Sequence, residues 1–163
     1  MPIRSRSRLF PFALAVAFAL ACAGSALAEG GRGPGTYVPE PPTRADRAVK
    51  AALGAVGTPY RWGGESPATG FDCSGLVRWA YSRVGIDLPH NSFALLGEGR
   101  RVREASMEPG DILIFEGFGH VGLYLGNGRM VHSPETGRNV EVVRLASTNY
   151  DSRLVAARRV AAA

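Results

Sequence analysis

The segment Phe71–Ala80, F-D-C-S-G-L-V-R-W-A, combines the start of a helix with a single thiol. Asp72 is a favourable N-cap residue, and apolar residues follow it at helical spacing, so a helix is predicted to begin at Cys73. Most lone cysteines are small buried apolar residues. At the first turn of a helix, however, the macrodipole favours a thiolate. Because the adjacent Asp72 carboxylate opposes ionisation, a cationic partner for the thiolate is expected as well.

The amino-terminal residues have the features of a secretory signal peptide. Three arginines and no acidic residue precede the apolar run Phe12–Ala21, and Ala26-Leu27-Ala28 is a small-residue cleavage site. The run is too short for a stable membrane span. We therefore predict that residues 1–28 are removed on export to the periplasm, the cell wall or the exterior. Cleavage before a lipidated Cys22 is the alternative, which Ala19 at the third position before it disfavours.

The composition of the remaining chain limits its function. The formal charge of +5 includes the three signal arginines, so the mature chain carries +2. Its basic residues are scattered and not interleaved with aromatics, which argues against nucleic-acid binding. The Gly- and Pro-rich residues 29–43 are predicted to form a flexible linker. Residues 44–163 suffice for one domain with a single core.

Helical patterns come first in this domain and strand patterns follow. One helix is predicted from the capping-box sequence Thr43–Asp46 to Gly57, and a second follows Asp72. Apolar strands separated by Gly, Asn and Pro turn signals are predicted at 112–115, 120–125, 129–132, 140–143 and 154–160. This order predicts the α+β class, with the helices packed on one side of an antiparallel sheet of about five to six strands.

Two histidines lie at the ends of predicted neighbouring strands. His120 begins one strand and His132 ends the next, whereas His90 lies in a predicted loop, where a solvated surface role is expected. A nucleophilic thiol needs a base and a group that orients the base, and Cys73 with these two histidines could supply all three. A zinc site on the same residues is the alternative, but no closely spaced Cys or His pair supports it.

The turn between the two strands constrains this arrangement. Asn127-Gly128 is the usual signal for a two-residue hairpin loop. In a regular hairpin with that loop, His120 and His132 would point to opposite faces, because side chains alternate along a strand. We therefore predict a three-residue connection, Gly126-Asn127-Gly128, which places both histidines on one face with Gly122 opposite His132. A β-bulge in either strand is the alternative.

Ordered motifs across the domain resemble those of the NlpC family of cell-wall cysteine peptidases, which have a papain-like fold. The motifs are Gly57–Gly64, Asp72–Val77, Leu88-Pro89, Pro109-Gly110-Asp111, His120–Gly126, Val131-His132 and Ala157–Val160. One segment departs from the family pattern. After Leu88-Pro89 many relatives carry an arginine, a small hydroxyl pair and a glutamine, whereas this chain has His90-Asn91-Ser92, so specificity carried by that segment stays open.

The resemblance implies roles for individual residues. Cys73 is implied as the nucleophile, His120 as its base and His132 as the residue that orients His120. Tyr60 is implied to assist the oxyanion or the substrate carbonyl. Two further residues are implied to line the cleft and hold the peptide, namely Asp72 and Ser74, although Asp72 can equally be a plain helix cap. Trp62 can line the groove or fill the core.

The resemblance also implies an activity. The expected protein is an exported endopeptidase that cuts peptidoglycan stem peptides between γ-D-glutamate and the diamino acid through an acyl-enzyme. No cofactor or metal is implied, no transmembrane segment is expected after signal cleavage, and a monomer is expected. A thiol amidase or esterase acting on another substrate and a non-catalytic wall-binding domain are the alternatives.

Overall fold

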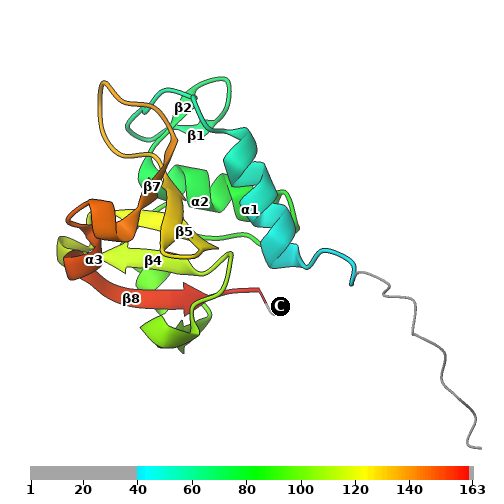
Figure 1. The fold of residues 1–163 in the computed structure, drawn as a ribbon. Coiled ribbons are helices and arrows are strands. Elements are labelled where there is room, and N and C mark those ends of the chain that lie inside the picture. Colours follow the sequence, from blue (N-terminus) through cyan, green and yellow to red (C-terminus); the bar gives the residue numbers. More distant parts are fainter. Residues whose placement is uncertain (1–39, 162–163) are drawn as a thin grey trace, which may run out of the picture. The chain divides into compact units, whose positions relative to one another are not determined.

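The computed structural model of the chain describes residues 40–161 (Figure 1). The predicted signal peptide, residues 1–28, and most of the predicted linker, residues 29–43, lie outside the described residues. Within the described part, no helix is long and apolar enough to cross a membrane.

The described chain contains short helices and strands in an α+β arrangement. The α-helices are α1 (Arg44–Gly54), α2 (Cys73–Ser82) and α3 (Tyr150–Arg153). The strands are β1 (Glu65–Ser66), β2 (Gly70–Phe71), β3 (Arg100–Val102), β4 (Ile112–Phe115), β5 (Val121–Gly126), β6 (Arg129–His132), β7 (Glu141–Arg144) and β8 (Leu154–Arg159). Single 3-10 turns cover Ala94–Gly97, Glu104–Ser106, Glu116–Phe118 and Leu145–Ser147.

Six of the strands form one antiparallel sheet in the order β3-β8-β4-β5-β6-β7, and β1 pairs with β2 in a separate ribbon. Helices followed by a six-stranded antiparallel sheet confirm the predicted fold class. The strand β3 was not predicted, because its sequence Arg-Arg-Val has no run of apolar residues.

The two faces of the sheet are covered by different elements. Along β4, Ile112 and Ile114 point to the face where α1 and α2 pack, and Leu113 and Phe115 point to the opposite face. Figure 1 shows both helices on the same side of the sheet. All four side chains are fully buried, and burying one such side chain stabilises the fold by about 1.5–3 kcal/mol. This apolar centre fixes the strands that carry the histidines.

The helix α1 begins as its sequence predicts. Thr43 Oγ1 accepts a hydrogen bond from the Asp46 N–H at 3.1 Å, and the Asp46 carboxylate accepts one from the Thr43 N–H at 2.9 Å. This reciprocal pair is a capping box. Small buried residues on the inner face of the helix allow close packing, namely Ala45, Ala48 and Ala52. The capping-box prediction is therefore confirmed.

An ion pair joins the beginning of β4 to the end of the chain. The Arg159 guanidinium binds both oxygens of the buried Asp111 carboxylate at 2.7 Å. A buried carboxylate needs such charge-assisted hydrogen bonds to offset its lost hydration. The carboxylate also accepts a hydrogen bond from the Glu108 N–H at 2.8 Å, which closes the turn before β4. Two distant sequence motifs thus meet at one structural link.

The hairpin between β5 and β6 corrects the predicted turn. Gly126 pairs with Arg129, so the loop has two residues, Asn127 at φ 53 and Gly128 at φ 66. The predicted three-residue connection is therefore wrong. Two consecutive positive φ angles are those of a type I′ turn, which suits Asn-Gly. The register shifts between Tyr124 and Gly126. This β-bulge places His120 and His132 on the same face of the sheet, which a regular two-residue hairpin would not do.

Candidate active site

Cys73 is the first residue of α2. The Asp72 carboxylate accepts a hydrogen bond from the Gly75 N–H at 2.7 Å and so caps the helix. The thiol is partly buried, and its Sγ lies 3.8 Å from the Gly119 carbonyl oxygen. Burial raises the pKa of the Cys73 thiol above its ordinary value, although the backbone N–H of Val121 opposes this effect. The resting thiol is therefore expected to be protonated.

His120 and His132 lie side by side, as predicted. His120 immediately precedes β5, His132 ends β6, and His120 Nε2 lies 2.8 Å from His132 Nδ1. Burial lowers the pKa of His120 to about 3, and the neighbouring His132 adds to this effect. Burial, followed by the charge of Arg138, lowers the pKa of His132 to about 4. Both imidazoles are thus neutral near pH 7, and one donates a hydrogen bond to the other.

Tyr150 holds the pair of imidazoles and was not identified from the sequence. Its ring stacks on His120 at a centroid distance of 5.3 Å and meets His132 edge-on at 5.2 Å. The Phe115 ring packs on two of these rings, with centroid distances of 4.8 Å to Tyr150 and 5.8 Å to His120. Tyr150 begins the four-residue helix α3, and the sequence of that segment has no pattern that indicates contact with a histidine.

One cavity of about 210 Å³ brings most of the predicted residues together. Its lining includes Cys73, His120, Tyr60, Asp72, Ser74, Trp62, His90, Asn91, Ser92, Gly119 and Pro134. His132 is fully buried and is not part of the lining. The Trp62 side chain is 86% exposed, which excludes the core-filling role and leaves it on the rim of the cavity.

Asp72 organises the polar side of this cavity. Besides capping α2, its carboxylate accepts a hydrogen bond from the Gly63 N–H at 2.9 Å and one from the Ser74 hydroxyl at 3.2 Å. His90 Nε2 lies 2.9 Å from the same carboxylate. The solvated surface role expected for His90 is therefore wrong. The residues of the segment after Leu88-Pro89 gave no sequence signal for this contact, which depends on the tertiary fold.

Tyr60 lies in the loop before β1, and its backbone N–H donates a hydrogen bond of 2.8 Å to the Arg138 carbonyl oxygen. Burial raises the pKa of Tyr60, and the charges of Cys73 and Asp72 raise it further. The phenol therefore stays protonated near pH 7. A neutral hydroxyl beside a thiol can donate a hydrogen bond to an oxygen that gains negative charge.

Residues 40–161 contain no cluster of three or more His, Cys, Asp or Glu side chains arranged to hold a metal ion. The contact between His120 Nε2 and His132 Nδ1 directs these two nitrogens at each other and not at a shared ion. The geometry of the described residues therefore favours acid–base chemistry over the zinc alternative.

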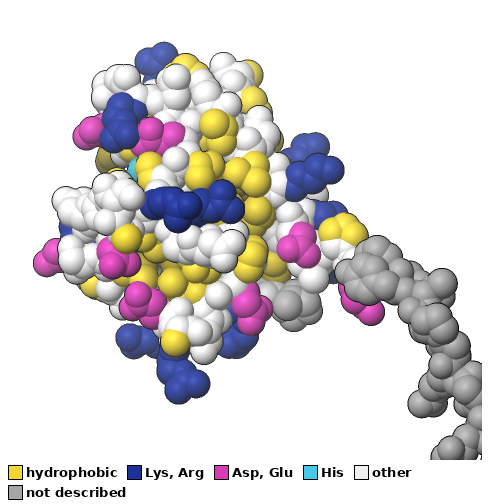
Figure 2. Space-filling view, viewed as in Figure 1, with side chains coloured by type: hydrophobic (Ala, Val, Ile, Leu, Met, Phe, Trp, Pro, Cys, Tyr) yellow, Lys and Arg dark blue, Asp and Glu magenta, His cyan; other side chains and the backbone are white. Residues whose placement is uncertain are grey.

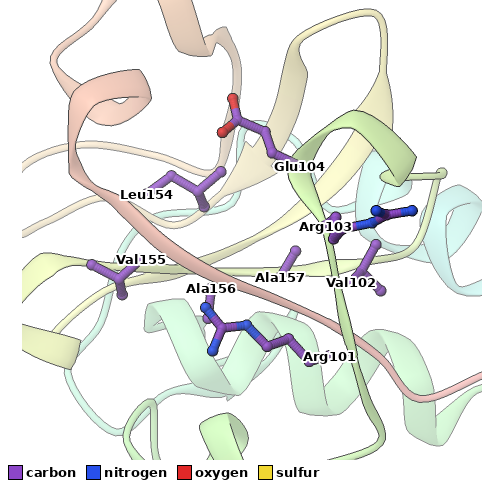
Figure 3. A pocket seen from close by; sticks show the side chains of 8 residues that line it. All are labelled: Arg101, Val102, Arg103, Glu104, Leu154, Val155, Ala156 and Ala157. Carbon is purple, nitrogen blue, oxygen red and sulfur yellow. The ribbon is translucent and has the colours of Figure 1, made fainter.

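A second hollow, of about 270 Å³, runs along β3 and β8 (Figure 3). Its lining carries Arg101, Arg103 and Glu104 beside aliphatic side chains, and it contains no thiol or imidazole. The face in Figure 2 shows basic and acidic side chains interspersed over apolar surface. The hollow along β3 and β8 lacks the thiol and imidazole that the cavity at Cys73 contains, so the cavity at Cys73 is the candidate active site.

The arrangement can perform nucleophilic catalysis from a neutral resting state. Because the pKa of the Cys73 thiol is raised and the pKa of His120 is lowered, a thiol and a neutral imidazole are favoured over a thiolate and an imidazolium. From such a pair, an attack by the sulfur would require transfer of the thiol proton to His120. The enclosure of His120 by His132 and Tyr150 keeps its ring in one orientation for that transfer.

Known proteins with similar sequences were found for this chain. It is 50% identical over 108 residues to a Mycobacterium tuberculosis protein named as a probable endopeptidase, covering 64% of this chain and 28% of that protein. It is 42% identical over 110 residues to the γ-D-glutamyl-L-lysine dipeptidyl-peptidase of Bacillus subtilis, covering 64% and 37%. It is 36% identical over 138 residues to the murein DD-endopeptidase MepH of Escherichia coli, covering 77% and 51%.

The chain thus spans between 28% and 51% of the length of these relatives. Among solved structures, an NlpC/P60 family protein from Bacillus cereus is similar, with a TM-score of 0.69 and 33% identity over 74% of this chain and 41% of that one. The sequence model of the NlpC/P60 family matches residues 57–159, which include Cys73, His120 and His132. The chain therefore belongs to the NlpC/P60 family.

Proposed function

We propose that this domain is a cysteine endopeptidase that hydrolyses the stem peptides of peptidoglycan. The observation that carries the proposal is the contact of His120 with His132 beside the thiol of Cys73, with the thiol and His120 lining one cavity. Nucleophile, base and orienting group are the set that acyl transfer requires. The E. coli relative, named a murein endopeptidase, supports peptidoglycan as the substrate.

The reaction proceeds in two half-reactions. His120 Nδ1 accepts the thiol proton while Cys73 Sγ attacks the carbonyl carbon of the scissile bond. The C–N bond then breaks, the leaving amine takes the proton from His120, and the acyl group remains on Cys73 as a thioester. In the second half-reaction His120 accepts a proton from water, which attacks the thioester. The carboxylic acid leaves and the thiol regains its proton.

Tyr60 and the first turn of α2 stabilise the developing oxyanion. The Tyr60 hydroxyl remains a donor near pH 7 because its pKa is raised. The backbone N–H of Cys73 lies at the positive end of the α2 dipole, and such donors favour negative charge. Asp72 and Ser74 form the wall of the cleft. Because both have hydrogen-bond partners within the protein, they hold the loop and helix start against the bound peptide.

The bond that we assign is the one between γ-D-glutamate and the diamino acid. Support comes from the B. subtilis relative, whose name specifies a γ-D-glutamyl-L-lysine bond. The E. coli relative is named a DD-endopeptidase, so the D,D cross-link is the competing target. Because peptidoglycan lies outside the cytoplasmic membrane, this substrate agrees with export directed by the predicted signal peptide, residues 1–28.

Digestion of defined muropeptides tests the proposal. The purified chain from Glu29 onward is incubated with a disaccharide tetrapeptide and with a D,D-cross-linked dimer, and the products are identified by mass. We expect the tetrapeptide to yield a disaccharide dipeptide ending in γ-D-glutamate, and the Cys73→Ala variant to yield no product. Conversion of the dimer to intact tetrapeptide monomers would instead assign the D,D bond. Binding without cleavage of either would refute the peptidase proposal and favour a wall-binding domain.

A further inference from the structure

We propose that Glu141 is a positioning residue for this active site, and that it acts through His132 to fix which ring nitrogen of His120 carries the proton. The inference rests on the proposed cysteine peptidase function and adds a fourth residue to it. Glu141 is the first residue of β7 and pairs directly with His132 across the β6–β7 ladder. This register directs the two side chains to the same face of the sheet.

His132 Nε2 is the atom that points to this role. Within residues 40–161, His132 Nε2 is a buried side-chain nitrogen that has no hydrogen-bond partner. The whole His132 side chain is fully buried, and buried polar groups normally have a hydrogen-bond partner. Glu141 Oε1 lies 3.4 Å from this nitrogen. This separation is slightly longer than the about 2.7–3.2 Å of an N–H···O hydrogen bond, and Glu141 is the acceptor that faces this nitrogen.

The carboxylate selects one of two tautomers. A neutral imidazole has one N–H and one bare nitrogen, and an ionised carboxylate can only accept a hydrogen bond. The proton of His132 is therefore favoured on Nε2, facing Glu141, which leaves its Nδ1 bare. Since His132 Nδ1 then accepts, the hydrogen bond of 2.8 Å must be donated by His120 Nε2. His120 Nδ1 is left bare, and it can accept the thiol proton.

The opposite tautomer would disable the base. If His132 carried its proton on Nδ1 and donated it to His120 Nε2, the single proton of His120 would lie on Nδ1. That nitrogen could then accept nothing from Cys73. A bare His132 Nε2 would also face the Glu141 carboxylate, and two acceptors repel each other. Glu141 thus disfavours the Nδ1-protonated form of His120, although it does not contact His120.

The backbone that carries Glu141 is itself held in place. The Arg138 guanidinium contacts Glu141 Oε1, the same oxygen that faces His132. Backbone hydrogen bonds of 2.8 Å link Arg138 to Tyr60 and Val140 to Thr58. The start of β7 is therefore attached to the loop that carries Tyr60, and it does not move independently of the cavity.

A purely structural role for Glu141 is the competing explanation. The ion pair of Arg138 with Glu141 is partly exposed, and its only function could be to anchor the loop between β6 and β7. The two explanations differ for Arg138→Gln, which removes the ion pair and keeps the carboxylate beside His132. If Glu141 acts only through its ion pair with Arg138, this variant behaves like Glu141→Gln. If Glu141 acts by selecting the tautomer of His132, this variant behaves like the wild type.

The test measures the tautomers and the kinetics in the same proteins. The chain from Glu29 onward is labelled with ¹⁵N in histidine, and the ring nitrogen shifts are recorded by NMR near pH 7 for the wild type, Glu141→Gln and Arg138→Gln. We expect the Nε2–H form for both His120 and His132 in the wild type and in Arg138→Gln. In Glu141→Gln the amide can accept or donate, so a mixture with the Nδ1–H form of His132 is expected. On a muropeptide, kcat of Glu141→Gln should fall about tenfold with KM unchanged.

The outcomes separate this inference from the proposed function. Redistributed tautomers in Glu141→Gln support the inference even if no muropeptide is cleaved, because the NMR measurement needs no substrate. An Nδ1–H form of His132 in the wild type overturns it. Unchanged tautomers and an unchanged kcat in Glu141→Gln overturn it as well, and so does an equal fall of kcat in both variants with unchanged tautomers.

Discussion

Replacement of Gly75 by alanine tests how closely the loop before β1 packs on α2. A Cβ at Gly75 would lie 2.0 Å from the Gly64 carbonyl oxygen, 2.9 Å from His90 Nε2 and 3.0 Å from the Asp72 carboxylate. To reach an ordinary contact, the carbonyl must move by about 1.4 Å, which a closely packed interior resists. That carbonyl also accepts the Asp72 N–H at 2.9 Å, so the displacement breaks a hydrogen bond at the helix start.

The expected magnitude follows from three contributions. Overpacking costs about 1–3 kcal/mol, and the lost hydrogen bond costs about 1 kcal/mol. Alanine in place of glycine within a helix restores about 1 kcal/mol. Gly75→Ala should therefore lower the free energy of unfolding by about 1–3 kcal/mol, and it should reduce kcat because Asp72 and Cys73 shift with the loop.

Urea denaturation followed by circular dichroism measures the free energy of unfolding, with muropeptide cleavage measured on the same samples. Gly54→Ala is the matched control, since Gly54 ends α1 and a Cβ there meets no atom within 4 Å. The control should be stabilised by up to about 1 kcal/mol. A Gly75→Ala variant as stable and as active as the wild type would show that the loop does not pack on α2 as described.

Two further predictions concern the imidazoles. In the unfolded chain both imidazoles titrate near 6.5, whereas in the fold the pKa of His120 is about 3 and that of His132 about 4. Below pH 6.5 the unfolded state therefore binds more protons than the folded state, and the free energy of unfolding must fall as the pH falls. At pH 5 the free energy of unfolding should be about 2 kcal/mol lower for each imidazole. Urea titrations should show this decrease in the wild type and not in a His120→Gln/His132→Gln variant. If the stability of the wild type and of the variant depended equally on pH, the lowered pKa values would be contradicted. Tyr150→Phe keeps the ring on His120 and should leave kcat near the wild-type value, whereas Tyr150→Leu should lower kcat roughly 2–10-fold through the lost stacking. Equal kinetics of the two Tyr150 variants would exclude a positioning role for the ring.

The sequence predicted those features that local patterns determine. The capping box at Thr43, the helix start at Cys73 and the core strands each depend on residues close together in the chain. It was also predictable that His120 and His132 share a face, because the alternation of side chains allows this in only one of the two possible strand registers. How the chain reaches that register was not predictable. A bulge at Leu125 and a three-residue loop satisfy the same alternation, and the Asn-Gly turn preference prevailed.

The surroundings of the site were less predictable because they depend on tertiary contacts. His90 reaches Asp72 from a position 18 residues further along the chain. Tyr150 reaches His120 from a four-residue helix whose sequence is mainly polar. Neither residue belongs to a periodic pattern, so its partner cannot be inferred before the fold is known. Glu141 becomes visible only through the β6–β7 register.

The nucleophilic role of Cys73 is the central claim, and trapping of the acyl-enzyme tests it most directly. The chain from Glu29 onward is mixed with a stem tetrapeptide, quenched with acid during turnover and analysed by intact mass and peptide mapping. We predict a wild-type adduct on Cys73 with the mass of the acyl fragment that ends in γ-D-glutamate. The Cys73→Ala variant should show neither adduct nor cleavage. Cleavage of the tetrapeptide by Cys73→Ala at the wild-type rate would contradict the account.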